Sequence, residues 1–387
     1  MAYITQWLNE QMQARTADSI IDDTLHYLKS RNKLLDGFMP VTTYDTFDVL
    51  KYVVQDLRTV ASVIPFGGEI PLRNQGRFTK LTGELFKIGT GRRYDEERQI
   101  ALRKAMEEAE LKGINVQNIY DPESAQLVQQ GTNSSLADYL FGTIADVAQE
   151  MGDLLHALSW QSVQFGVVNY QDPFTNLSLS LDYRDPEADY GYAPHGVMAH
   201  FPSDLTGTAN DWTQSSTADG LRDIEEDVEQ YIETNGFPPD VIVMSRHLRR
   251  HLINQESTRR ATAQVINSNG GVIVENSGQV GYRQLDMLLQ DRELPQLAIY
   301  DEQYHQEDTS GKVVGRRRFL NQDRYVFLKR GMGEQVMGPT LEADFAPGMH
   351  VVTRQVREYP HVDATQGVAT ALPLIPNPKL LFSRRVA

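Results

Sequence analysis

The residues of this 387-residue chain best placed to do chemistry are two histidines one helical turn apart, His247 and His251. An i, i+4 spacing puts two imidazoles on one face of a helix, as in the zinc sites of helical metalloproteases. The intervening residues are Leu248, Arg249 and Arg250, so the general-base glutamate of the H-E-x-x-H pattern is missing and two cations crowd the site. We interpret the pair as part of a solvated basic face and predict no metal there.

Other catalytic and cofactor-binding motifs are incomplete or missing. His195 and His200 lie in a loop-rich segment with no acidic ligand placed by a regular element, so no metal is predicted there either. Gly331 and Gly333 are not followed by the third glycine of a dinucleotide-binding fingerprint. We therefore predict a tight turn at this position. The sequence has no phosphate-binding G-x-x-x-x-G-K-[ST] run and no G-x-S-x-G nucleophile elbow. We therefore predict no catalytic residue and no cofactor.

Charged clusters have simpler interpretations. The carboxylate run at 225–229 is typical of a solvated helix face. The arginine run at 316–318 can contact nucleic acid or form salt bridges between subunits, and intersubunit salt bridges are favoured. Lys80 and Lys87 lie in an extended segment from which a lysine can form an isopeptide crosslink to a neighbouring asparagine. An ordinary surface lysine is the favoured interpretation at both positions.

Composition excludes further classes of protein. The chain has 37 Lys+Arg against 52 Asp+Glu, a net charge of -15, which argues against a dedicated nucleic-acid binder. It has no cysteine, so disulfides, thiolate metal sites, iron–sulfur clusters and a cysteine nucleophile are excluded. The 27 arginines against 10 lysines favour extensive protein–protein contact, because arginine forms bidentate interface pairs.

The sequence shows no membrane or export signal. No stretch approaches the roughly 18–20 uninterrupted apolar residues of a membrane helix. The start of the chain, MAYITQWLNEQMQART, lacks the basic and apolar regions of a signal peptide. We therefore expect a protein that is made in a cytoplasm and does not contact a membrane.

The first hundred residues combine predicted helices with an extended segment. Apolar residues at helical spacing predict two short amphipathic helices on an arm, over 21–28 and 47–57, with Gly37 and Pro40 between them. Residues 65–94 are rich in glycine, threonine and arginine and predict a long β-hairpin or paired extended loop. A projection of this length inside a globular protein is usually functional.

The rest of the chain reads as an α+β arrangement. Its strongest signal is a helix of roughly 30 residues over 134–165, long enough to act as a structural strut. We predict further helices over 95–113, over 221–232 with Gly236 as the stop, and after Ser245; strands over 176–183, 241–244, 298–300, 324–329 and 350–356; a loop-rich excursion over 184–218; and an extended tail over 371–387.

The order of these elements and four segments carry a resemblance to a known family. The segments are DEERQIALRKAMEEAELKG at 95–113, WTQSSTADGLRDI at 212–224, GFPPDVIVMSRHLRRHLI at 236–253, and AIYDEQYHQEDTSGKVVGRRRFLNQDRYVFLKRGMGEQVMGPTLEAD at 298–344. The chain resembles, over about residues 40–360, the major capsid proteins of tailed bacteriophages. These proteins have the Hong Kong ninety-seven fold, and the match is to the lambda-type branch, the phage major capsid protein E family.

The resemblance implies a domain organisation. It comprises an N-terminal arm (1–64), an extended loop (65–94), a peripheral domain with a spine helix (95–183, helix 134–165), a loop-rich insertion (184–218), an axial domain (219–335), and return strands with an extended C-terminal tail (336–387). The insertion has no counterpart that explains its role.

The same resemblance implies sites of contact between subunits. The candidates for intersubunit contact are Arg73, Arg77, Phe78, Lys80, Phe86, Lys87, Arg92, Arg93, Arg316, Arg317 and Arg318. The candidates for a loop at the five-fold and quasi-six-fold axes are Asn269, Gly270, Gly271, Asn276 and Gly278.

The function implied by the resemblance is that of a shell protein. Copies of the chain are expected to assemble as pentamers and hexamers, in the bacterial host cytoplasm, into the icosahedral capsid of a virion. Expected partners are portal, scaffolding and decoration proteins, and non-specific contact with packaged double-stranded DNA. Two alternatives stay open: an encapsulin-like nanocompartment shell, and a cytoplasmic enzyme whose site no motif reveals.

Overall fold

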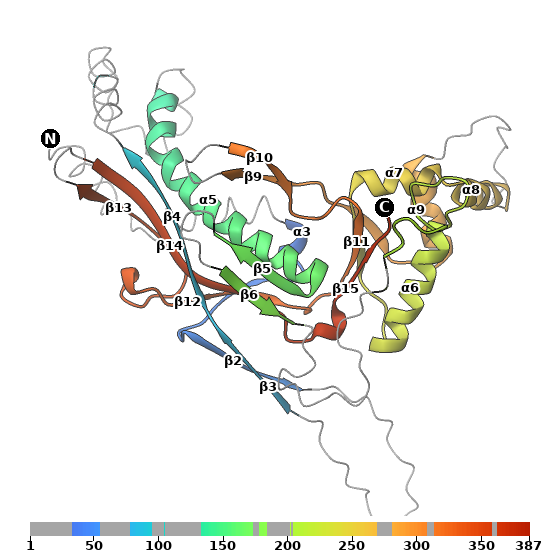
Figure 1. Cartoon of the computed structure of the whole chain (residues 1–387), viewed down its shortest axis with the longest axis horizontal. Coiled ribbons are helices and arrows are strands. Elements are labelled where there is room, and N and C mark those ends of the chain that lie inside the picture. Colours follow the sequence, from blue (N-terminus) through green and yellow to red (C-terminus); the bar gives the residue numbers. More distant parts are fainter. Residues whose placement is uncertain are drawn as a thin grey trace, which may run out of the picture.

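The computed structural model describes residues 33–54, 78–94, 104, 133–172, 178–183, 202, 204–268, 281–307, 313–357 and 362–387. Figure 1 shows helices and strands in the order α3 (Lys33–Asp36), β1 (Val41–Thr43), β2 (Asp48–Val54), β3 (Phe78–Glu84), β4 (Phe86–Tyr94), α5 (Asn133–Phe165), β5 (Val167–Gln171), β6 (Ser178–Asp182), α6 (Gly220–Asn235), β7 (Val241–Met244), α7 (Arg246–Asn254), α8 (Glu256–Ser268), α9 (Tyr282–Asp291), β8 (Gln296–Ile299), β9 (Gln303–Glu307), β10 (Val313–Arg318), β11 (Arg324–Leu328), β12 (Glu334–Gly338), η2 (Leu341–Ala343), β13 (Met349–Arg357), β14 (Val362–Leu374), η3 (Pro378–Leu380) and β15 (Phe382–Arg385).

The larger of two main sheets is built around β14. Strands β13 and β12 pair antiparallel with successive parts of one edge of β14, and β4 pairs antiparallel with its other edge. Strand β1 adds to β12 in parallel, with Val41 opposite Gln335. The sheet therefore joins segments that lie almost 300 residues apart in the sequence.

Helix α5 lies across this sheet (Figure 1). Its apolar residues Val147, Ala148, Met151 and Leu155 are buried against the strands. The helix approaches closely because β14 has Gly367 beneath it. A Cβ at this position would lie 2.4 Å from Met151 Cε and 2.6 Å from Val147 Cγ1.

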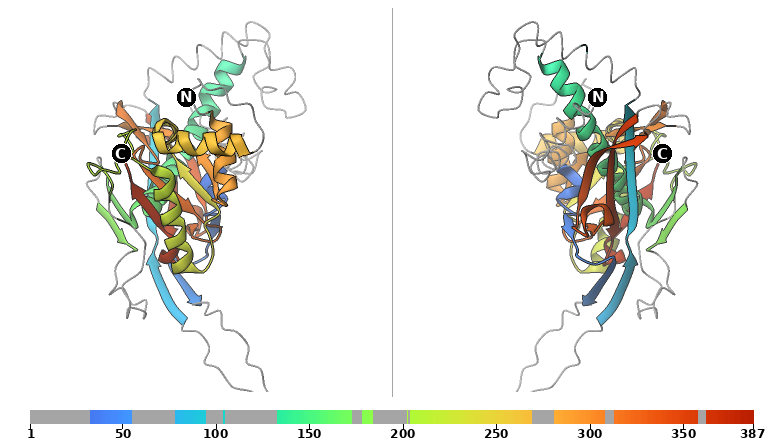
Figure 2. Two further views of the ribbon diagram at one scale, coloured as in Figure 1. Left: turned by 90° about the vertical axis from the view of Figure 1, so that its right-hand side faces the viewer. Right: turned by 90° about the vertical axis from the view of Figure 1, so that its left-hand side faces the viewer.

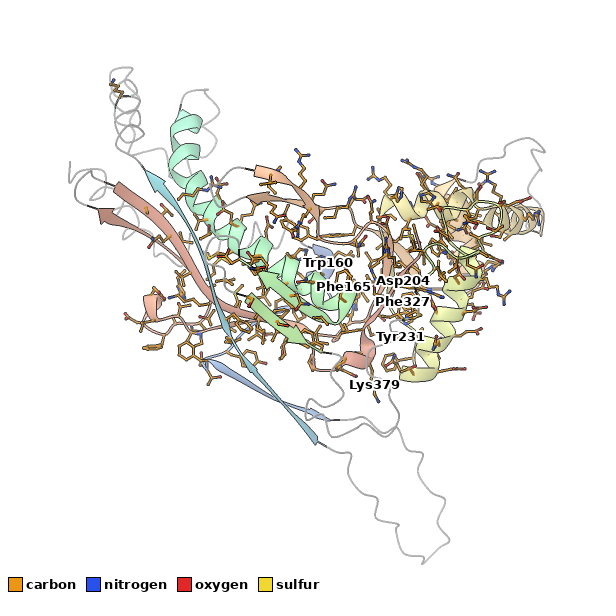
Figure 3. All side chains as sticks on the ribbon, in the orientation of Figure 1. Trp160, Phe165, Asp204, Tyr231, Phe327 and Lys379 are labelled. Carbon is orange, nitrogen blue, oxygen red and sulfur yellow. The ribbon has the colours of Figure 1, made fainter. Side chains whose placement is uncertain are left out.

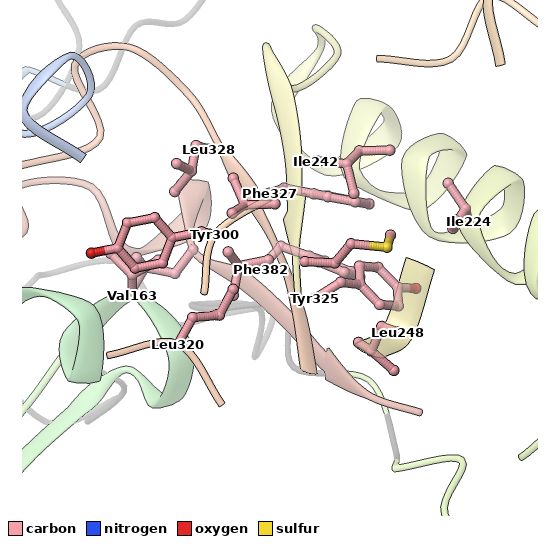
Figure 4. Packing of buried hydrophobic residues seen from close by; sticks show 14 of the residues in the cluster. Val163, Ile224, Ile242, Leu248, Tyr300, Leu320, Tyr325, Phe327, Leu328 and Phe382 are labelled. Atoms are coloured by element: carbon pink, nitrogen blue, oxygen red, sulfur yellow. The ribbon is translucent and has the colours of Figure 1, made fainter. Parts of the chain in front are cut away.

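The second main sheet has the strand order β15-β11-β7-β8 and lies beside helices α6 to α9 (Figure 1). Strand β11 pairs antiparallel with both β7 and β15, while β7 and β8 are parallel. Figure 4 shows its aromatic core, in which the rings of Phe327 and Phe382 stack with centroids 4.1 Å apart. Tyr231 of α6 meets Phe327 edge-on at 5.8 Å (Figure 3).

Local sequence signals set the ends of the helices in this region. The Asp219 side chain accepts a hydrogen bond from the amide of Arg222 and caps α6, and Gly236 ends the helix in the left-handed conformation. The Ser245 hydroxyl accepts a hydrogen bond of 3.1 Å from the Leu248 amide and caps α7. These caps confirm the predicted helix starting near 221 and the helix after Ser245.

The second main sheet has its own hydrophobic core, separate from the cluster between α5 and the larger sheet. It contains Leu35 and Met39 near the start of the described chain, Trp160 and Val163 near the end of α5, and the apolar residues of the second sheet. The C-terminal half of α5 therefore packs on both sheets, as expected of a strut. The predicted strands at 298–300, 324–329 and 350–356 are confirmed as β8, β11 and β13, with ends shifted by at most two residues.

The extended projection differs from its prediction. Residues 48–54, predicted as a helix, form strand β2, which pairs with β3 from Asp48 opposite Glu84 to Val54 opposite Phe78. Strand β3 therefore does not pair with β4, which lies in the larger main sheet. The run Val49 to Val54 satisfies helical spacing, but the β-branched residues and a pairing partner favour a strand. Figure 2 shows the β2–β3 ribbon extending away from the body.

Several predicted elements lie outside the described residues. They are the helix over 21–28, all of the helix over 95–113 except Lys104, and the axial-loop candidates Asn269, Gly270, Gly271, Asn276 and Gly278. The described part of the loop-rich excursion, residues 204–218, contains turns and bends without a helix or strand. Strand β6, predicted over 176–183, pairs antiparallel with β5.

Candidate functional site

The two glycines tested as a cofactor motif form a turn. Gly331 has a φ of 78° between β11 and β12, and the segment continues into a strand, not into a helix. A Cβ at Gly333 would lie 2.8 Å from the carbonyl oxygen of Leu374. Both glycines are therefore explained by the backbone conformation and by close packing.

The acidic run on α6 is divided between surface and interior, which corrects the prediction of a solvated face. Glu225 binds Arg292 of α9 at 2.6 Å, and Glu226 pairs with Arg222. Asp227 is buried, because the helix turns this residue towards the second main sheet.

Asp227 belongs to a buried polar cluster between α6, β11 and β15. Its two carboxylate oxygens accept hydrogen bonds of 2.9 and 3.0 Å from Arg384 Nη1, and it also accepts a hydrogen bond from the Tyr325 hydroxyl. Burial and the neighbouring carboxylate raise the pKa of Tyr325 well above its ordinary value. Nearby, Asp223 accepts a hydrogen bond of 2.9 Å from the Trp212 indole, and burial raises the pKa of Asp223. These contacts fasten α6 to the C-terminal strand.

A buried histidine that the sequence did not indicate, His156, lies on α5 where the helix packs against Tyr300 and Phe319. His156 Nε2 accepts a hydrogen bond of 2.9 Å from the Trp160 indole and lies 2.8 Å from the Tyr300 hydroxyl. Phe319 packs edge-on against the imidazole at 4.9 Å. Burial lowers the pKa of His156 to about 3, so the ring is neutral at physiological pH.

The histidines at i, i+4 on α7 do face each other. Their Nε2 atoms are 3.2 Å apart and their rings meet edge-on at 4.5 Å. His247 is exposed and His251 is half-buried. Burial first, and then the charge of His247, lower the pKa of His251. Within the described part of the chain, no group of three or more acidic or histidine side chains is arranged to hold a metal.

The arginine run lies on β10, which pairs only with β9 among the described strands. Arg318 forms an ion pair with Asp301 at 2.8 Å, whereas Arg316 and Arg317 are exposed. Val314 at the start of the same strand is 69% exposed. The β9–β10 hairpin therefore presents two cations and an apolar side chain to its surroundings.

The candidate contact residues of the extended segment do not form one surface among the described residues. Lys87 pairs with Glu342, and Arg92 Nε donates to Glu150 at 3.1 Å, so two cations of β4 are held within the chain. Phe86 is half-buried. Phe78, Lys80 and Arg93 lie on strands β3 and β4, but their side chains are not described. The remaining candidates on the extended segment and the axial loop lie outside the described residues: Arg73, Arg77, Asn269, Gly270, Gly271, Asn276 and Gly278. His195 and His200 also lie outside them.

An apolar surface that the sequence did not indicate lies at the root of the β2–β3 ribbon. Phe47 is 48% exposed and meets Phe345 edge-on, with ring centroids 6.1 Å apart. Phe345 is 56% exposed and Leu341 is 68% exposed. Asp344 and Phe345 both have positive φ, a conformation that few non-glycine residues adopt. We call Phe47, Leu341 and Phe345 the ribbon-root patch.

None of the described helices is both long and apolar enough to cross a membrane.

Comparison with solved structures identifies the fold. The chain is similar to a protein assigned as the capsid protein of a prophage in Escherichia coli CFT073, with a TM-score of 0.50 and 14% identity over 94% of this chain and 98% of that chain. A phage-related protein of Bordetella bronchiseptica RB50 has a TM-score of 0.49 and 8% identity over 95% and 96% of the two chains. A virus-like particle protein of Pyrococcus furiosus has a TM-score of 0.39 and 9% identity over 95% and 98%.

No protein-family model matches the sequence, and no curated protein matches it. The similarity to the E. coli prophage structure extends over nearly the whole of both chains, so the two share a fold. The predicted α+β fold, the Hong Kong ninety-seven capsid fold, is therefore confirmed. The match to the lambda-type branch rests on the sequence segments and stays a prediction.

Proposed function

We propose that the chain is the major capsid protein of a tailed phage. In this proposal, copies of it assemble as pentamers and hexamers into an icosahedral shell around double-stranded DNA, in the cytoplasm of a bacterial host. The observation that carries the proposal is the shared fold with the prophage capsid protein over 94% of this chain. The chain is then a structural component of the virion and not an enzyme.

The β2–β3 ribbon supports assembly with other copies. Its strands pair only with each other among the described residues, and the ribbon extends away from the body (Figure 2). A two-stranded ribbon is marginally stable in water by itself, because it buries little apolar surface. A neighbouring subunit lying against it would supply that burial.

The exposed apolar and cationic groups support the same proposal. The ribbon-root patch combines two exposed phenylalanines and an exposed leucine. Exposed apolar side chains gathered in one place are typical of protein–protein contact. On the β9–β10 hairpin, Arg316 and Arg317 are available for salt bridges with carboxylates of a neighbour.

The proposed domains follow the two main sheets. The sheet around β14 with α5 is the proposed peripheral domain, and the β15-β11-β7-β8 sheet with α6 to α9 is the proposed axial domain. The extended loop is now proposed to span β2 to β3, because β4 belongs to the peripheral sheet. The segment with Asn269, Gly270, Gly271, Asn276 and Gly278 is retained as the proposed axial loop, and portal, scaffolding and decoration proteins as proposed partners.

Electron microscopy of the full-length chain, expressed alone and together with its neighbouring genes, tests the proposal. Hollow shells, tubes or hexameric capsomers are the expected result. Compact monomers at micromolar concentration under every condition contradict it. Shells that contain a folded cargo protein in place of DNA would favour the nanocompartment alternative, and a monomer whose melting temperature rises with a small ligand would favour the enzyme.

A further inference from the structure

The histidine pair on α7 has the geometry of a chelating metal site. Two nitrogens about 2.0–2.1 Å from one zinc ion, at the tetrahedral angle of about 109°, lie about 3.4 Å apart. His247 Nε2 and His251 Nε2 are 3.2 Å apart, which corresponds to an angle of about 103° at a shared metal ion. The two side chains therefore reach this separation without a change of the helix.

Arginines on α7 near the histidine pair make contacts with other groups. The guanidinium of Arg249 lies 3.9 Å from the ring centroid of Tyr282, on α9. Arg246 forms an ion pair with Asp301 at 3.6 Å. Arg250 is exposed, so water and salt screen its charge.

The surroundings of the pair also contain negative charge. Asp211 and Asp323 both act electrostatically on His251, opposing the effect of His247 and Arg250. Asp211 is itself fixed, because its carboxylate accepts hydrogen bonds from the amides of Gly207 and Thr213. A cation held by the two imidazoles would therefore lie in a field to which the fixed Asp211 carboxylate contributes.

We propose that His247 and His251 chelate one divalent transition-metal ion, of the class of Zn²⁺, Ni²⁺ or Cu²⁺, through their Nε2 atoms. Imidazole nitrogen suits these ions, whereas Mg²⁺ and Ca²⁺ prefer oxygen. With two protein ligands, the remaining coordination positions are open to water or to a group from another molecule. This proposal does not depend on the proposed capsid function.

Calorimetric titration of the full-length protein with ZnCl₂, and separately with MgCl₂, tests the site. The variants are His247→Gln and His251→Gln, and the matched control is His305→Gln, an exposed histidine on β9. We expect one zinc site per chain, no magnesium binding, and zinc affinity lower by about tenfold or more in each single variant, since chelation is lost. The control is expected to bind zinc like the unaltered protein.

Protection from chemical modification gives a second measurement without any substitution. Zinc should protect both His247 and His251 from diethyl pyrocarbonate, as read by mass spectrometry, while His305 stays reactive. The proposal is overturned if the unaltered protein binds no zinc, if either variant keeps the full affinity, if the His305→Gln control loses as much, or if zinc protects only one of the two histidines. Circular dichroism without metal checks that each variant is folded.

Discussion

Acid should destabilise the folded chain through His156. The ring is buried between Trp160, Tyr300 and Phe319, and its Nδ1 atom has no hydrogen-bond partner among the described residues. A charge placed there would be desolvated without a carboxylate in contact with the imidazole among the described residues. The pKa of His156 is accordingly lowered to about 3, against 6.5 for an exposed histidine.

The direction of the effect follows from the two pKa values. Between pH 6.5 and pH 3 the unfolded chain binds a proton at this position and the folded chain does not. The free energy of unfolding therefore falls as the pH falls below 6.5. Each pKa unit corresponds to about 1.36 kcal/mol, so the loss is about 2 kcal/mol at pH 5 and approaches about 5 kcal/mol at pH values below 3.

Urea unfolding between pH 8 and pH 4.5, followed by fluorescence of the unassembled subunit, measures this contribution. In His156→Gln, which can still accept from Trp160, the decrease between pH 7.5 and pH 5 should be smaller than in the unaltered chain by about 2 kcal/mol. The control is His305→Gln, at an exposed histidine on β9, which should keep the original pH dependence. Parallel curves for the unaltered chain and His156→Gln, or a His156 pKa near 6.5 by NMR, would refute the reasoning.

Three further predictions concern the parts of the fold. Arg384→Ala leaves the buried carboxylate of Asp227 without its cation and should lower the free energy of unfolding by about 3–5 kcal/mol, measured by urea unfolding. Gly367→Ala forces Met151 away from β14 and should cost about 1–3 kcal/mol in the same assay. Replacing residues 51–81 by Asn-Gly, between the paired residues 50 and 82, should leave a soluble chain that forms no shells in electron micrographs.

The two point substitutions have matched controls, and the shortened ribbon has an outcome that would contradict its prediction. Arg222→Ala breaks an exposed ion pair and should change stability by less than about 0.5 kcal/mol; an equal loss in this variant would contradict the argument from burial. Gly315→Ala, on β10 with open space around the added methyl group, should be close to neutral. Shells formed by the chain with the shortened ribbon would show that the β2–β3 ribbon is not required for assembly.

The sequence predicted those elements that carry their own local signals. The helix over 134–165 is confirmed as α5 because its apolar residues repeat at helical spacing, and α6 is bounded by the Asp219 cap and the Gly236 stop. The error at residues 48–54 has a different origin. A short apolar run fits both a helix and a strand, and its pairing with β3, some thirty residues away, decides between them.

The functional groups were predicted less completely, because burial and proximity depend on the fold. Asp227 is one of several acidic residues at 225–229. It pairs with Arg384 only because the fold places β15 beside α6. Phe345 is 56% exposed, and it and Asp344 adopt a positive φ that no glycine at these positions indicates in the sequence. The sequence shows the four-residue spacing of His247 and His251. The 3.2 Å separation of their Nε2 atoms depends on the side-chain conformations, which the sequence does not give.

The central position of β14 has a consequence for the order in which the chain can fold during synthesis. Strand β4 finds its partner only after residues 363–371 have been made, and β1 must wait for β12. At about 5–20 residues per second, the ribosome needs roughly 15–60 seconds to pass from β4 to β14, and the edges of β4 are unpaired during that time. A chain released before β14 is complete lacks the larger sheet. Completion of the larger sheet therefore follows synthesis of the chain at least to residue 374.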